Sequence, residues 1–147
     1  MTATTAHDPS PFLTTPAGRA LLTRLRGSTD GRTGDQLSSA IRAVTMAGSV
    51  LPPDEVDAAL TAITLLLAEY QPSLLDGAPD EQALREWLRH VDTELTPGRR
   101  MAAQATLVRI EIDLENQWYD AHVADGSVPQ VLEDLHRLRN ALTDAAG

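Results

Sequence analysis

Residues 97–125 constrain the fold most strongly, because their apolar pattern predicts one long helix with two apolar faces. At about 100° per residue, the first face contains Ala103, Leu107, Ile110, Leu114, Trp118 and Ala121. The second face, about 120° away, contains Met101, Val108, Ile112 and Tyr119. Such a helix requires neighbours on both sides, so we expect it to lie at the centre of a helical domain.

The remaining segments show the same helical periodicity, and none alternates between apolar and polar residues as a half-buried strand does. Thr15 and Thr96 each precede a proline, a pair typical of the first residues of a helix. The predicted helices cover residues 15–26, 35–47, 53–70, 79–95, 97–125 and 129–145, of which 53–70 is the most apolar. We therefore expect an all-α fold, with five to six helices in bundle-like or orthogonal packing.

The first residues differ in composition from the rest of the chain. Residues 1–14 are rich in Thr, Pro, Ala and Asp and offer little to bury, so we expect a flexible N-terminal arm followed by a single domain over 15–147. The segment has neither a basic residue before Arg19 nor an apolar run long enough for a signal peptide or a membrane span. These features predict a cytoplasmic protein that does not enter a membrane.

Composition excludes several kinds of chemistry. The chain of 147 residues contains no cysteine, which removes thiol nucleophiles, disulfides and cysteine-ligated metals. Every basic residue apart from histidine is arginine, so there is no lysine for a Schiff base or a phosphate-binding loop. The arginine bias and the alanine content indicate a GC-rich, bacterial genome. The net charge of −9 disfavours nucleic acid as a partner and favours a basic protein.

The candidate site lies between the two apolar faces of residues 97–125, where Gln104, Glu111, Glu115 and His122 form a polar row. Glu111 lies about 40° from Leu107, inside the first apolar face. Burial there would raise the pKa of its carboxyl group, as a general acid or base requires. The alternative is an ion pair between helices, with Arg42 or Arg85 as the cation. Trp118 joins these residues as a ligand-stacking candidate.

A second carboxylate and histidine pair lies in the last predicted helix. The spacing Glu133-x-x-His136 resembles half of the motif in carboxylate-bridged di-iron bundles, which implies a metal-binding helical bundle. Helical geometry nevertheless places Glu133 about 160° and His136 about 100° from Leu135, toward water. The chain also contains no second copy of the motif, so we predict neither a metal nor another cofactor.

These observations leave two main hypotheses. The first is a non-enzymatic helical interaction module, such as an accessory, immunity-type or regulatory protein, that binds a basic protein partner or associates with itself through helix 97–125. The alternative is a small-molecule-binding protein or small enzyme that uses Glu111 as an acid or base. No catalytic residue is assigned, because the sequence contains no nucleophile motif.

Overall fold

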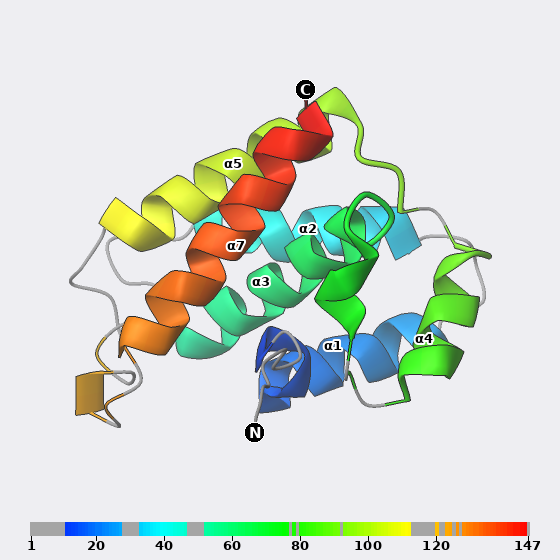
Figure 1. Cartoon of the computed structure of the whole chain (residues 1–147), viewed down its shortest axis with the longest axis horizontal. Coiled ribbons are helices and arrows are strands. Elements are labelled where there is room, and N and C mark those ends of the chain that lie inside the picture. Colours follow the sequence, from blue (N-terminus) through cyan, green and yellow to red (C-terminus); the bar gives the residue numbers. More distant parts are fainter. Residues whose placement is uncertain are drawn as a thin grey trace, which may run out of the picture.

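The computed structural model (Figure 1) describes residues 11–27, 33–46, 52–76, 78, 80–91, 93–112, 120, 123–124, 126 and 128–146. These residues form an all-helical fold, which confirms the predicted fold class. Its α-helices are α1 (Pro16–Gly27), α2 (Thr33–Thr45), α3 (Pro53–Leu67), α4 (Glu81–Leu88), α5 (Pro97–Ile112) and α7 (Val128–Ala146). Two short 3-10 helices, η2 (Pro11–Thr14) and η3 (Pro72–Leu75), accompany them.

Helix α3, and not the predicted helix over residues 97–125, lies at the centre of the fold. It packs against α1, α2, α5 and α7, and every residue from Ala59 to Leu67 is buried. This burial agrees with the composition of 53–70, which is the most apolar of the predicted helices. The helix ends earlier than predicted, at Leu67, and Tyr70 beyond its end is half-exposed rather than part of the buried face.

Helix α5 buries one apolar face rather than two. The first face is confirmed at Ala103, Leu107 and Ile110, which are buried against the core. Side chains of the second face are exposed, at 68% for Met101 and 39% for Val108. The two-sided prediction is therefore wrong at these positions. The reason is that α2, α3 and α7 together cover only one arc of α5.

Polar contacts fix α5 against α2. Thr106 is fully buried, and its hydroxyl donates a hydrogen bond to the carbonyl oxygen of Ile41 at 3.2 Å. Arg109 donates to the carbonyl oxygens of Val44 and Thr45, at 2.9 and 3.3 Å. These carbonyls belong to the last turn of α2, where the helix itself supplies no donor. α5 thus caps the C-terminal end of α2.

The predicted helix starts are confirmed by their capping bonds. The Thr15 hydroxyl oxygen accepts a hydrogen bond from the backbone N–H of Gly18 at 3.0 Å, in the first turn of α1. The Thr96 hydroxyl oxygen likewise accepts from the backbone N–H of Arg99 at 3.1 Å, in the first turn of α5. Each bond satisfies one N–H that has no partner within its helix.

The core begins earlier in the chain than predicted. Phe12 and Leu13 in η2 are 2% and 0% exposed, so the prediction of a flexible arm over 1–14 is wrong for these residues. Thr61 of α3 and Thr15 both donate hydrogen bonds to the carbonyl oxygen of Phe12, at 2.8 and 2.9 Å. Burial of the apolar side chains of Phe12 and Leu13 holds η2 against α3. Residues 1–10 lie outside the described residues.

The two remaining α-helices, α4 and α7, differ in how they are attached. α7 buries Val131, Leu135, Leu138 and Leu142, which follow one another at helical spacing. α4 is shorter than predicted, because it ends at Leu88 and leaves Val91 and Leu95 beyond it. It makes few close backbone contacts with the other helices, and only Leu84 is buried within it. None of the helices in the described ranges is both long and apolar enough to cross a membrane.

Candidate functional site: two grooves of opposite charge

The structure describes only part of the predicted polar row. The Gln104 side chain is exposed on α5, where it lines a groove against α7. Glu111 belongs to the last turn of α5, but its side chain lies outside the described part, as do Glu115, Trp118 and His122. The row as a ligand site therefore stays a prediction. Its one described member lies beside a groove at the surface rather than between two buried faces.

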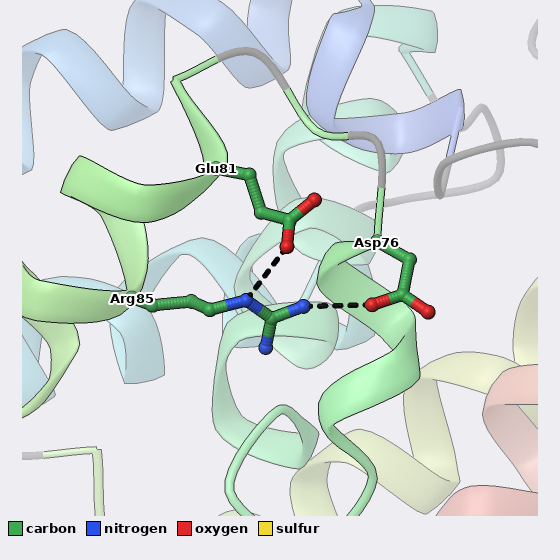
Figure 2. Close-up of polar contacts among 3 residues, drawn as sticks. All are labelled: Asp76, Glu81 and Arg85. Atoms are coloured by element: carbon green, nitrogen blue, oxygen red, sulfur yellow. Dashed lines mark hydrogen bonds and ion pairs between the residues drawn. The ribbon is translucent and has the colours of Figure 1, made fainter.

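Arg85 is one of two arginines considered as an ion-pair partner for Glu111, but in the structure it pairs with two other carboxylates. Its Nη2 atom lies 2.8 Å from Asp76 Oδ1, and its Nε atom lies 3.0 Å from Glu81 Oε2 (Figure 2). Glu81 is in the first turn of α4, whereas Asp76 follows η3 directly. The partly buried guanidinium thus fastens α4 to the preceding turn, which is a structural role.

The first groove, here called the acidic groove, lies between α1 and α2 and over the start of α3. Both α1 and α2 pack on α3, but they share few close contacts with each other. The space between them has a volume of about 940 Å³. Small side chains line much of it, namely Ala17, Ala20, Ser39, Ala40, Ala43 and Ala58. Because these side chains are short, the backbone of another helix can approach closely.

The rim of the acidic groove carries mainly negative charge. Asp35, Asp54 and Glu55 line it, with Arg24 as the cation. All four side chains are exposed, and none forms an ion pair or side-chain hydrogen bond with another residue of the described segments. The three carboxylates lie in the first turns of α2 and α3, where they also stabilise the helix dipoles.

The second groove, here called the cationic groove, lies between α5 and α7 and is more enclosed than the first. Its volume is about 470 Å³. Met101, Leu107, Val108 and Leu142 supply its apolar lining. Its polar lining consists of Arg100, Gln104, Arg139 and Thr143, with no carboxylate among the described lining residues. The chain contains 21 acidic residues, so a groove whose described charged lining residues are all arginines differs in charge from the protein as a whole.

Sequence reasoning placed Gln104 in a site but missed both grooves. One sequence feature could have indicated the acidic groove. Residues 16–27 and 33–45 each contain short side chains at helical spacing, and charged residues lie next to them. Such residues also occur in ordinary helix packing, so the pattern alone does not separate a groove from a core. Glu133 and His136 are both exposed, as predicted, and the described residues contain no group of acidic or histidine side chains suited to a metal ion.

The grooves are the features of the described structure from which a function can be argued. Comparison with known proteins adds no second line of evidence. No family model matches the chain, and no curated protein or solved structure matches it either.

Proposed function

We propose that the protein is a non-enzymatic interaction module that binds a basic helical segment of a partner protein in its acidic groove. The observation that carries this proposal is the combination of an open groove lined by short side chains with exposed carboxylates on its rim. A helix placed in such a groove is recognised by its apolar face, with flanking cations meeting the rim.

The dimensions of the groove suit a short helix. α1 contains 12 residues and α2 contains 13, so at 1.5 Å per residue each wall is about 18–20 Å long. A segment of about 12 residues, or three helical turns, spans that length. Small residues on its contact face, such as Ala or Ser, would let it lie close to Ala40 and Ala43 on one wall and Ala20 on the other.

The negative charge on the rim of the groove determines that the partner segment is positively charged. Lysine or arginine at both ends of the incoming segment would meet Asp35 at one end of the groove and Asp54 with Glu55 at the other. An exposed ion pair contributes about 0.2–1 kcal/mol, so the three carboxylates together account for about a tenfold change in affinity. The net charge of −9 also steers a basic partner toward the protein before contact.

Binding of a designed peptide tests the proposal. A labelled peptide of about 14 residues, helical, with Ala and Leu on one face and Arg at both ends, is titrated with the protein and followed by fluorescence anisotropy. We expect saturable binding that weakens as salt increases. The same peptide with Glu in place of Arg should not bind. Equal affinity for both peptides would contradict the proposal.

Paired variants locate the binding to the groove. Ser39 is exposed and lines it, so Ser39→Trp should block the peptide whereas Ser39→Ala should leave its affinity unchanged. The triple variant Asp35→Asn, Asp54→Asn, Glu55→Gln should weaken binding about tenfold. Its control removes the same number of charges from exposed positions outside the groove, Asp120→Asn, Glu133→Gln and Asp144→Asn. Circular dichroism is used to check that each variant is folded.

A further inference from the structure

We infer that the cationic groove between α5 and α7 is a binding site for a small amphipathic anion, a molecule with one aliphatic chain and a carboxylate head. This site is separate from the acidic groove, and the inference does not depend on the proposed protein partner. It is carried by the apolar lining of the groove, its enclosure and the sign of its charged lining residues.

The arrangement of the helices explains how the groove forms. α5 and α7 lie side by side in opposite directions, so the first residues of α5 face the last turns of α7 (Figure 1). Leu107 and Leu142 are buried at the contact, at 1% and 5% exposure, whereas Met101 and Val108 stand beside it at the surface. An aliphatic chain lying along this line would cover the exposed part of Met101 and Val108 and remove their apolar surface from water.

The guanidinium groups that line the groove indicate that the ligand is an anion. Arg100 lines the groove from α5 and Arg139 lines it from α7. The N-terminal end of α5 and the C-terminal end of α7 are neighbours, so their opposite dipoles largely cancel. Asp144, although close in sequence to Arg139, lies about 140° around α7 from it and is not among the residues that line the groove. Both charged side chains among the described lining residues are therefore cations, and an anionic head can accept a hydrogen bond from the Arg100 guanidinium, while Arg139, which also takes part in another interaction, lies on the opposite wall.

The size of the groove fits a small molecule better than a protein segment. Its volume of about 470 Å³ falls within the range of about 300–1,000 Å³ that is typical of small-ligand pockets. Gln104 and Thr143 add neutral hydrogen-bonding groups to the lining. A carboxylate has acceptor oxygens for the guanidinium groups as well as for the Gln104 amide and the Thr143 hydroxyl.

The test compares two probes with the same chain length and opposite charge. Decanoate and decyltrimethylammonium are titrated separately into the full chain, and binding is followed by calorimetry and by amide shifts in two-dimensional NMR. We expect decanoate to bind with a dissociation constant below about 1 mM, with shifts gathered on residues 100–108 and 138–143. Decyltrimethylammonium should bind at least tenfold more weakly. Equal binding of the two probes, or shifts centred elsewhere, would overturn the inference.

Variants separate charge from folding. Arg100→Gln and Arg139→Gln should each weaken decanoate binding several-fold, whereas Arg19→Gln, an exposed change on α1, should have no effect. Val108 is partly exposed, so Val108→Asp and Val108→Asn should both fold. Val108→Asp should weaken decanoate binding at least tenfold more than Val108→Asn, because the two side chains have nearly the same shape but only one repels the anion.

The oligomeric state distinguishes a ligand site from an interface between two copies. Sedimentation of the unliganded protein should show a monomer, and decanoate should leave its mass unchanged. A dimer that Val108→Asp dissociates would mean that a second copy covers this groove, as the alternative of self-association through helix 97–125 predicts, and would overturn the ligand site.

Discussion

Replacing Gly18 with alanine tests how the N-terminal turn is attached to the core. An alanine in a helix interior is ordinarily about 1 kcal/mol more favourable than glycine. At Gly18, however, an added Cβ would overlap the carbonyl oxygen of Phe12 and would lie 2.6 Å from the Thr61 hydroxyl oxygen. Because the overlapping atom belongs to the backbone, η2 must move to accommodate the methyl group.

The size of the effect follows from the contacts that this movement breaks. Phe12's carbonyl oxygen accepts hydrogen bonds from Thr61 and Thr15, and each contributes about 1 kcal/mol. Forcing an extra methyl group into a packed site costs about a further 1–3 kcal/mol. After the helix-propensity gain is subtracted, we expect Gly18→Ala to lower the free energy of unfolding by about 2–4 kcal/mol.

Urea denaturation followed by circular dichroism measures this loss against two matched controls. Gly27 and Gly98 also lie in α-helices, but an added Cβ meets nothing within 4 Å at either position. Gly27→Ala and Gly98→Ala should therefore leave stability unchanged or raise it by up to about 1 kcal/mol. If Gly18→Ala were as stable as the two controls, the packing of η2 against α1 and α3 would not be as described.

Three further substitutions probe the polar contacts between elements. Arg109→Met removes the donors to the last carbonyls of α2 and should lower stability by about 1–3 kcal/mol in urea denaturation, whereas a loss below 0.5 kcal/mol would argue against the cap. Arg85→Gln should speed amide hydrogen exchange in α4 while changing the global free energy of unfolding by about 1 kcal/mol or less; unchanged exchange would mean that its pairs with Asp76 and Glu81 do not fasten α4. Thr96→Ala should cost about 1 kcal/mol through loss of the helix cap, and Thr96→Ser should retain most of it.

The positions of the helices could be predicted because local signals agree with the tertiary structure. The Thr–Pro pairs at residues 15–16 and 96–97 mark helix starts by a hydrogen bond that needs only neighbouring residues. The buried faces of α2 and α7 follow from regular helical spacing, with Leu37 and Ile41 in one and Leu135 and Leu138 in the other. These features are local, so periodicity and capping rules are sufficient to identify them.

The burial of particular faces could not be predicted, because it depends on which helix lies next to which. Met101 and Val108 have the spacing of a buried face, yet no described helix covers them. Thr106 is polar but fully buried, because a carbonyl oxygen 65 positions earlier in the chain accepts a hydrogen bond from its hydroxyl group. Phe12 follows a stretch of polar and small residues. It lies in the core because Gly18 leaves room for its backbone and the Thr61 hydroxyl donates a hydrogen bond to its carbonyl oxygen. The grooves likewise arise from gaps between helices that no local pattern contains.

The burial of α3 has a thermodynamic consequence for the two grooves. Its first turn forms part of the acidic groove, and the helix also packs against α7, which forms one wall of the cationic groove. Any displacement of this helix by one occupant would therefore be felt by the other. Linkage then requires reciprocity: if a basic peptide alters the affinity for a carboxylate, the carboxylate must alter the affinity for the peptide by the same factor.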